Sequence, residues 1–239
     1  MPEEINRVLV DHAATLFFAP TISAVENLNN EGIDKSRVIL SGDVMYDAAL
    51  FYANKAEQRI SLLNDLGVNA GGYALLTFHR AENTDVKQNI LNIVEALVSV
   101  SQNLPVILPL HPRTRKILEK FNLLTLLYDR LIVIEPVSYL EMVLLEKYAS
   151  LVITDSGGVQ KEAYFHQVPS VTLRKETEWV ELVENGWNKL VDPASENIYE
   201  AIMQGHKPLS WTPLYGDGHA ANKILKELLE FDCNANYSR

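Results

Sequence analysis

Residues 151–163 read LVITDSGGVQKEA, in which an apolar run is followed by an acid, a serine and two glycines. The run from Leu151 to Thr154 is rich in Val, Ile and Leu, which is typical of a strand buried on both faces of a sheet. Helical spacing follows the glycines and predicts a helix over residues 159–165. A strand, a turn and a helix in this order form one repeating unit of a parallel α/β sheet.

The same unit recurs along the chain. Further apolar runs predict strands at residues 16–19, 38–40, 73–78, 105–110, 131–134 and 170–173. Helical spacing is clearest from Val86, where Ile90, Ile93, Val94 and Leu97 fall on one stripe, and it is also found at residues 140–148 and 220–231. Because strands alternate with helices over short loops, the sequence predicts a doubly wound α/β fold with a parallel sheet.

The pattern divides the chain into four parts. Residues 1–47 hold too few elements to bury a sheet on both faces. Residues 48–72, with a helix predicted around Ala56 to Leu66 and glycines at the end, are expected to be a connector. Residues 73–218 form a complete α/β domain, and residues 219–239 form a final amphipathic helix and tail.

Composition excludes several function classes. The 239 residues, 47% hydrophobic and 22% charged, fit a globular protein of one large or two small domains. A net charge of −10 argues against binding to nucleic acid, although a local basic pocket for a small phosphate compound stays possible.

The cysteine content and the hydropathy suggest a location. Cys233, the one cysteine, cannot form an internal disulfide or a cysteine metal site, which suits a reducing cytosol. No apolar run approaches the roughly 20 residues that span a bilayer, and the acidic N-terminus does not look like a signal peptide. We therefore expect a cytoplasmic protein with no membrane partner.

Polar residues that follow a predicted strand are the candidates for a binding site, because ligands of open α/β sheets bind at the carboxyl ends of strands. The segment after residues 73–78 contains His79 and Arg80, a titratable group and a fixed positive charge that suit an anionic substrate. The alternative is that Glu82 and Asn83 cap the next helix and that the histidine is solvated.

Three more strand ends carry such residues. His111 and Pro112 are read first as the start of a helix, although His111 could line a cleft. The turn of Ser156, Gly157 and Gly158 presents backbone N–H groups and a helix dipole to a phosphate, or is a serine N-cap with flexible glycines.

The helix after the glycines and the next strand each add one candidate. Glu162, one turn into the helix, could accept two ribose hydroxyls, and Arg174 could bind the same phosphate from the next strand end. Lys175 and Glu176 are read as solvated charges. No Ser-His-Asp elbow and no metal-ligand spacing is present, so neither a metal nor a cofactor is expected.

Together these segments resemble one family. The stretches PEEINR, FAPT, TFHRAEN, HPRT, IEPVSYLEMV, TDSGGVQKEA, VTLRKETE and YGDGHAANKI, from Pro2 to Ile224, are similar in order and spacing to the non-hydrolysing UDP-N-acetylglucosamine 2-epimerases. GDVMYDA and TEWVELVENG look more like the subgroup that acts on UDP-2,3-diacetamido-2,3-dideoxyglucuronate. The commonest members have Arg-Pro where this chain has Trp179 and Val180.

The resemblance implies a GT-B-like fold, with one complete Rossmann-like C-terminal lobe in residues 73–218 and a remnant of the N-terminal lobe in residues 1–47. It implies a UDP-sugar substrate and assigns a UDP-binding or catalytic role to nine residues. Ser156, Gly157 and Gly158 would hold the diphosphate, Arg80 and Arg174 would lie near the phosphates, Glu162 would bind the ribose, and Val137 and Met142 would contact the uridine. His79 would steady or protonate the departing UDP oxygen.

The family reaction, which serves surface polysaccharide synthesis, inverts C2 by loss of UDP from C1 and removal of the C2 proton, followed by addition of UDP to the glycal intermediate. The carboxylates that move the proton belong to the first lobe, so the resemblance implies that this chain alone is inactive and binds UDP weakly. A nucleotide-sugar binding module and a GT-B glycosyltransferase lobe are the alternatives. Members of the family are usually dimers, so a homodimer is possible.

Overall fold

The computed structural model describes residues 2–195 and 197–231, so Cys233 lies outside the described residues. Contacts divide the chain into two compact units. The larger unit comprises Phe51–Trp211, and the smaller unit combines Met1–Leu50 with Thr212–Arg239. The domain boundaries expected from the sequence, after residues 47, 72 and 218, stay predictions.

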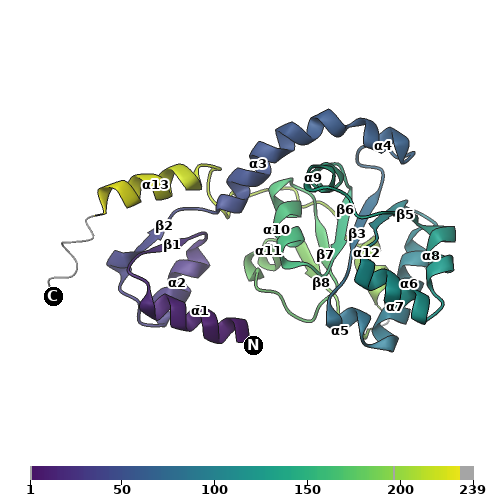
Figure 1. The fold of residues 1–239 in the computed structure, drawn as a ribbon, viewed down its shortest axis with the longest axis horizontal. Helices are drawn as coiled ribbons and strands as arrows, with labels where there is room; N and C mark the ends of the chain where they lie inside the picture. Colours follow the sequence, from purple (N-terminus) through teal and green to yellow (C-terminus); the bar gives the residue numbers. More distant parts are fainter. Residues whose placement is uncertain (1, 196, 232–239) are drawn as a thin grey trace. The chain divides into compact units, whose positions relative to one another are not determined.

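A six-stranded sheet is the centre of the larger unit (Figure 1). Its strands are β3 (Ala74–Thr77), β4 (Val106–Pro109), β5 (Ile132–Ile134), β6 (Leu151–Thr154), β7 (Ser170–Thr172) and β8 (Asn188–Leu190), in the spatial order β5-β4-β3-β6-β7-β8. Every neighbouring pair is parallel, as the alternation of strands and helices predicted. Strand β8 was not predicted from the sequence, because this edge strand has three residues and two of them are polar.

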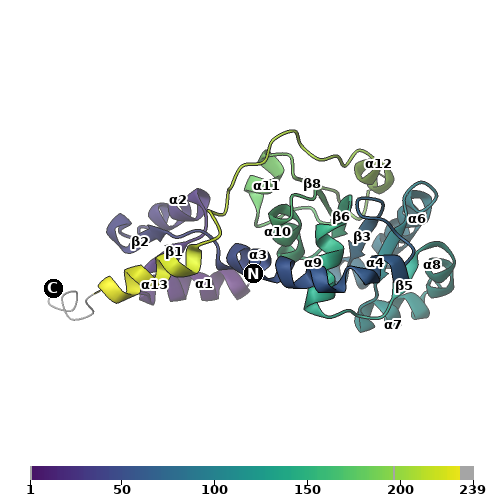
Figure 2. The same cartoon turned by 90° about the horizontal axis from the view of Figure 1, so that it is seen from above.

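Helices cover both faces of this sheet (Figures 1 and 2). Ala74 and Leu76 of β3 face a core built with α6 (Lys87–Val100), α7 (Pro112–Lys120), α8 (Leu124–Arg130) and α12 (Ile198–Met203). Leu75 faces the opposite core, which is built with α4 (Ser61–Asp65), α9 (Tyr139–Lys147) and α10 (Gly157–Phe165). The strands are apolar on both faces because each face packs on a helix layer.

The predicted helices form with small shifts at their ends. In α6 the four stripe residues Ile90, Ile93, Val94 and Leu97 are fully or almost fully buried. The helix expected around Ala56 to Leu66 differs most. Helix α3 (Val44–Ala56) ends there, a 3-10 turn covers Glu57–Arg59, and the short α4 follows. The short helices α5 (Ala81–Thr84) and α11 (Val180–Glu184) complete the larger unit.

The smaller unit contains a parallel pair of strands, β1 (Phe17–Ala19) and β2 (Val38–Leu40). Its helices are α1 (Pro2–Ala13), α2 (Ile22–Asn30), the start of α3, and α13 (Ala220–Glu230), and a 3-10 turn covers Lys35–Arg37. The Asp47 carboxylate of α3 accepts hydrogen bonds from the N–H groups of Ala220 and Ala221, so it caps α13 from a distant part of the chain. In the part of the chain that the structure describes, no helix is long and apolar enough to cross a bilayer.

The strand order fixes where a ligand can enter the larger unit. From β3 the chain moves outward to β4 and β5, and it then returns to the other side of β3 with β6, β7 and β8. The direction of winding therefore reverses between β3 and β6, and open α/β sheets bind ligands in the crevice at the carboxyl ends of such strands. His79 lies two residues after the end of β3, and Asp155 directly follows β6.

Candidate functional site

Asp155 connects the loops after β3 and β6 at the switch point, the place between these two strands where the direction of winding reverses. It follows β6, its side chain is fully buried, and its carboxylate accepts hydrogen bonds from the backbone N–H groups of His79 and Arg80 at 3.0 and 2.9 Å. Asn83 Nδ2 donates to the same carboxylate at 2.9 Å and to the Leu173 carbonyl at 3.1 Å. One buried acid thus fixes the loop after β3 to the ends of β6 and β7.

His79 lies at the edge of this network. Its side chain is 45% exposed, and its Nδ1 is 3.6 Å from Asp155 Oδ1. The carboxylate therefore faces Nδ1 and leaves Nε2 as the nitrogen available to a ligand. The His111 ring lies 5.4 Å from the His79 ring, while His111 Nδ1 accepts a hydrogen bond from the Arg113 N–H and caps α7. The structural interpretation of His111 and Pro112 is confirmed, and His111 also lies beside the candidate catalytic histidine.

The glycine turn opens α10. Ser156 occupies the N-cap position, but its side chain makes no capping hydrogen bond, so its hydroxyl does not have the capping role that the structural alternative requires. A Cβ atom at Gly158 would meet no atom closer than the Ser156 hydroxyl, at 3.9 Å. The start of the nine-residue helix α10 is therefore open on the side of Gly158, which suits a bound anion, whereas a Cβ atom at Gly157 would lie 3.4 Å from Trp179 Nε1 and 3.7 Å from Glu178 Oε2.

Glu162 lies one turn further along α10, where it accepts a hydrogen bond from the Tyr139 hydroxyl at 3.1 Å. Burial raises the pKa of the Glu162 carboxyl, and the hydrogen bond and the nearby Lys161 charge oppose this shift. Burial and the charge of Glu162 also raise the pKa of Glu146 well above its ordinary value. The site therefore combines one half-buried carboxyl on α10 with a second, fully buried one on α9.

Val137 and Met142 form an apolar border beside these acids. Both are half-buried, and both pack against the core between the sheet and helices α9 and α10, which includes Leu145 and Ala163. Val137 follows β5, and Met142 lies on the first turn of α9. The fold thus brings apolar side chains and Glu162 to the same pair of helices.

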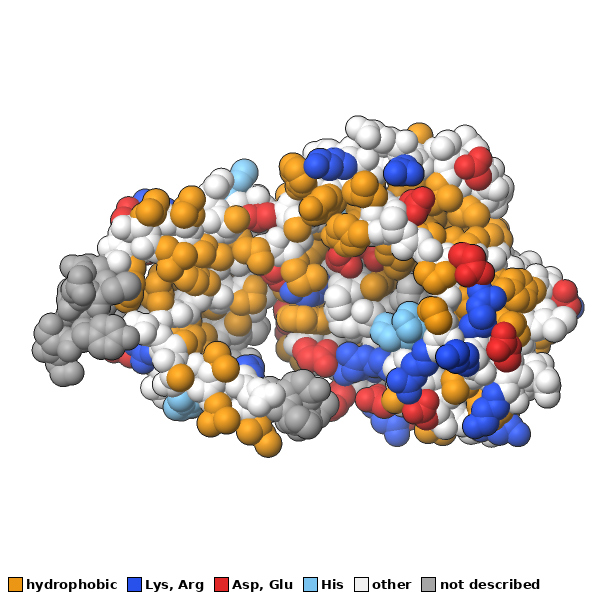
Figure 3. Space-filling model, in the orientation of Figure 1, with side chains coloured by type: hydrophobic (Ala, Val, Ile, Leu, Met, Phe, Trp, Pro, Cys, Tyr) orange, Lys and Arg blue, Asp and Glu red, His pale blue; other side chains and the backbone are white. Residues whose placement is uncertain are grey.

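Arg174 and Arg80 supply the cations. Arg174 follows β7, is 4% exposed, and donates from both terminal nitrogens to Glu178 at 2.8 and 2.9 Å. The charge of Arg80 also acts on Glu178 and helps to lower the pKa of its carboxyl, although Arg174 has the larger effect. On the larger unit, histidine side chains lie beside a group of Lys and Arg side chains over α5 and α7 (Figure 3).

Four residues of the site were not predicted from the sequence. Asp155 directly follows a predicted strand, but its role depends on full burial, and Glu146 gave no signal beyond its residue type. Tyr139 and Glu178 act through hydrogen bonds to Glu162 and Arg174, and only the spacing of four residues between Arg174 and Glu178 hinted at a pair.

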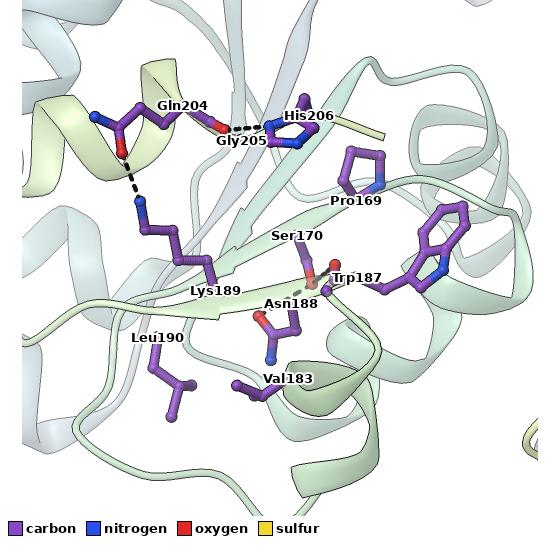
Figure 4. Close-up of a pocket in the computed structure, with 11 residues that line it drawn as sticks. Pro169, Ser170, Val183, Trp187, Asn188, Lys189, Leu190, Gln204, Gly205 and His206 are labelled. Carbon is purple, nitrogen blue, oxygen red and sulfur yellow. Dashed lines mark hydrogen bonds between the residues drawn. The ribbon is translucent and has the colours of Figure 1, made fainter. Parts of the chain in front are cut away.

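A cavity of the larger unit lies away from these strand ends. The cavity of about 690 Å³ borders the edge strand β8 and is lined by Trp187, Lys189, Gln204 and His206, among others (Figure 4). Lys189 and His206 each contact Gln204, through the amide oxygen and the backbone carbonyl respectively. Among the described residues, no group of three or more His, Cys, Asp and Glu side chains could hold a metal ion.

The chain is a parallel α/β protein with a glycine turn and an acid-bearing helix at the switch point, which is where open α/β sheets bind ligands. The family model described as UDP-N-acetylglucosamine 2-epimerase matches residues 1–229. The chain belongs to the UDP-N-acetylglucosamine 2-epimerase family.

Individual proteins agree with this membership. The chain is 49% identical to a UDP-N-acetylglucosamine 2-epimerase homolog of Methanococcus maripaludis, over 95% of this chain and 64% of that protein. It is 46% identical to the UDP-2,3-diacetamido-2,3-dideoxy-D-glucuronate 2-epimerase of Pseudomonas aeruginosa, over 95% of this chain and 63% of that protein.

A solved structure extends the likeness to the fold. The UDP-GlcNAc 2-epimerase of Methanocaldococcus jannaschii, in complex with UDP-GlcNAc and UDP, matches with a TM-score of 0.83 and 40% identity, over 97% of this chain and 65% of that one. The expected GT-B-like fold is confirmed by this match. The chain spans less than two thirds of the length of these relatives.

Proposed function

We propose that this chain is the nucleotide-binding part of a UDP-sugar 2-epimerase and that it holds UDP at the carboxyl ends of β3, β6 and β7. The observation that carries the proposal is that buried Asp155 binds the His79 loop at the switch point and is followed directly by α10, the helix that carries the glycine turn and Glu162. The relatives supply the substrate class, because the neighbour from Methanocaldococcus jannaschii is in complex with UDP-GlcNAc and UDP.

In this arrangement each part of the nucleotide has a partner of suitable chemistry. The diphosphate accepts hydrogen bonds from the N–H groups at the start of α10, near Ser156, Gly157 and Gly158. The ionised Glu162 carboxylate accepts the ribose hydroxyls. These four residues lie within two turns of one helix, so their spacing is fixed by α10 itself.

The remaining candidates complete the pocket. Val137 and Met142 border the uracil with apolar surface, and Arg80 and Arg174 provide positive charge for the phosphates. In the overall acidic chain, two cations at the ends of β3 and β7, the strands on either side of β6, give a local site for an anion.

The chemistry is an elimination followed by an addition. A base removes the C2 proton of the sugar, the C1–O bond breaks, and both electrons of that bond leave with UDP, which yields the glycal. UDP then adds back to C1 while a proton reaches the opposite face of C2. Charge on the leaving oxygen is greatest as the bond breaks, so His79 Nε2 and the α10 N-terminus stabilise the transition state more than the bound substrate.

We do not assign the residues that move the C2 proton to this chain. We propose that they lie in the portion of the relatives that this chain does not span, and that the chain alone binds UDP but does not epimerise. A cytoplasmic location and a homodimer are further proposals that follow from family membership.

Isotope exchange tests the proposal that the chain alone does not epimerise. The chain is incubated with UDP-GlcNAc, or with its diacetamido-uronate analogue, in deuterated water, and deuterium at C2 is measured by NMR. We expect no exchange above the level without protein. Exchange catalysed by this chain contradicts the assignment of the proton-transfer residues to another segment.

Calorimetry tests the binding half. UDP is titrated into the wild type and into Glu162→Ala, with Glu95→Ala as a matched control on the exposed face of α6. We expect Glu162→Ala to weaken binding about tenfold or more, because the buried hydroxyl partners lose a charged acceptor. Equal affinities for the three proteins rule out the ribose role.

A second candidate is a nucleotide-sugar binding module without catalysis, or one lobe of a glycosyltransferase. The incomplete coverage of the relatives favours keeping this candidate. Transfer of a labelled sugar from UDP-GlcNAc to an acceptor, without exchange at C2, supports the glycosyltransferase.

A further inference from the structure

The carboxylate of Glu178 occupies the anion side of the proposed nucleotide site. A Cβ atom at Gly157 would lie 3.7 Å from Glu178 Oε2, so this oxygen is next to the glycine turn that opens α10. The two terminal nitrogens of Arg174 both point at the same carboxylate. Glu178 is therefore paired with Arg174, the cation that a diphosphate at the glycine turn would need.

The segment that carries Glu178 is fixed against α10 by neighbouring contacts. Trp179 Nε1 donates to the Gly157 carbonyl at 2.9 Å, and the Thr177 hydroxyl donates to Gln160 Oε1 at 2.7 Å. The Lys161 ammonium lies 4.3 Å from the centre of the Trp179 ring. Because residues on both sides of Glu178 are anchored, its carboxylate is directed toward the glycine turn.

The two partners of the ion pair differ in freedom. The Arg174 side chain is 4% exposed, whereas the Glu178 side chain is 45% exposed. Arg174 Nε is buried and has no hydrogen-bond partner among the described residues, so the guanidinium has unused donor capacity. Glu178 can rotate into water at little desolvation cost, while Arg174 stays in place to receive another anion.

We propose that Glu178 is a placeholder for the nucleotide phosphate: it pairs with Arg174 in the empty site and is displaced when the diphosphate binds. The inference rests on the proposed UDP site and adds a specificity residue to it. Both anions cannot share Arg174 and the glycine turn without strong repulsion, so the exchange of Glu178 for phosphate lowers the affinity for UDP. The placeholder also keeps a buried cation paired while the site is empty.

Neutralising the placeholder tests this exchange. UDP and uridine are each titrated into the full chain and into Glu178→Gln. The amide removes the competing charge, so we expect Glu178→Gln to bind UDP about tenfold more tightly than the wild type. Uridine has no phosphate, so its affinity should change less than about twofold in the same variant.

A matched control separates the pair from the general charge of the region. Glu176 is exposed, and its charge also acts on Arg174, but it does not share the hydrogen bonds that Glu178 makes. Glu176→Gln changes the net charge by the same amount and should bind UDP within about twofold of the wild type. Tryptophan fluorescence confirms that each variant is folded before titration.

The outcomes distinguish this inference from the proposed function. If the wild type binds UDP and Glu178→Gln binds it equally or more weakly, Glu178 supports Arg174 rather than holding its place, and the inference is overturned while the site stands. Equal tightening in Glu176→Gln and Glu178→Gln also overturns it. If none of the proteins binds UDP or uridine, the proposed function itself fails.

Discussion

Asp155→Asn is the substitution that most directly probes the organisation of the site. The change keeps the shape of the side chain but removes its charge and replaces one acceptor oxygen by an NH2 donor. In the structure both carboxylate oxygens face donors: the His79 and Arg80 N–H groups and the Asn83 amide all point at this side chain. The amide nitrogen of the variant must therefore face at least one N–H donor in a fully buried position.

The expected loss follows from those contacts. Hydrogen bonds to a buried charged acceptor contribute about 1.5–3 kcal/mol each, and a donor left unsatisfied costs a further 1–3 kcal/mol. Asparagine retains one acceptor oxygen, so part of the network survives. We expect Asp155→Asn to lower the free energy of unfolding of the larger unit by about 3–5 kcal/mol.

Fluorescence during urea denaturation measures this loss selectively. Trp179, Trp187 and Trp211 are the three tryptophans of the chain, and all lie in the larger unit, so their emission follows that unit. Asp85→Asn is the control, because it removes an ion pair with Arg113 in which both side chains are about half exposed. This variant should have a denaturation midpoint close to that of the wild type. A loss below about 1 kcal/mol for Asp155→Asn refutes the organising role.

Three further predictions concern pH. The pKa of Glu162 is raised mainly by burial, so uridine affinity should fall as the pH drops through that pKa, and Glu162→Gln should abolish this dependence in titrations between pH 5 and 8. The pKa of buried Glu146 is raised well above 4.5, so the folded chain keeps a proton that the unfolded chain releases. The free energy of unfolding should therefore decrease with rising pH by up to about 1.4 kcal/mol per pH unit. Glu146→Met should remove this slope in denaturation at pH 5 and 8, and an unchanged slope contradicts the assignment. Burial lowers the pKa of His166 to about 4, so stability should fall by about 3 kcal/mol between pH 6.5 and 4, and His166→Leu should flatten that acid limb.

The sequence predicted the positions of the strands well because each buried strand is a continuous apolar run. It missed β8, whose Asn188 and Lys189 break the apolar pattern at the sheet edge. It also predicted one helix around Ala56 to Leu66 where the chain forms the end of α3, a 3-10 turn and α4. In that region the helical spacing continues through the break, so the pattern alone does not mark it.

The strand ends located the candidate site, but they did not predict the hydrogen bonds and ion pairs within it. Once β3, β6 and β7 are neighbours in a parallel sheet, their carboxyl ends must meet, which is why His79, Ser156 and Arg174 were found. The Asp155 network joins residues more than 70 positions apart, and the pairing of Arg174 with Glu178 depends on side-chain rotamers. Neither can be derived from periodicity.

A crystal structure of the chain with UDP tests the central claim most directly. The account predicts the diphosphate against the N–H groups of Gly157 and Gly158, the ribose hydroxyls on Glu162, and Glu178 turned away from Arg174. UDP bound elsewhere, for example in the cavity beside β8 that Trp187 and Lys189 line, contradicts the assignment of the site to the switch point between β3 and β6.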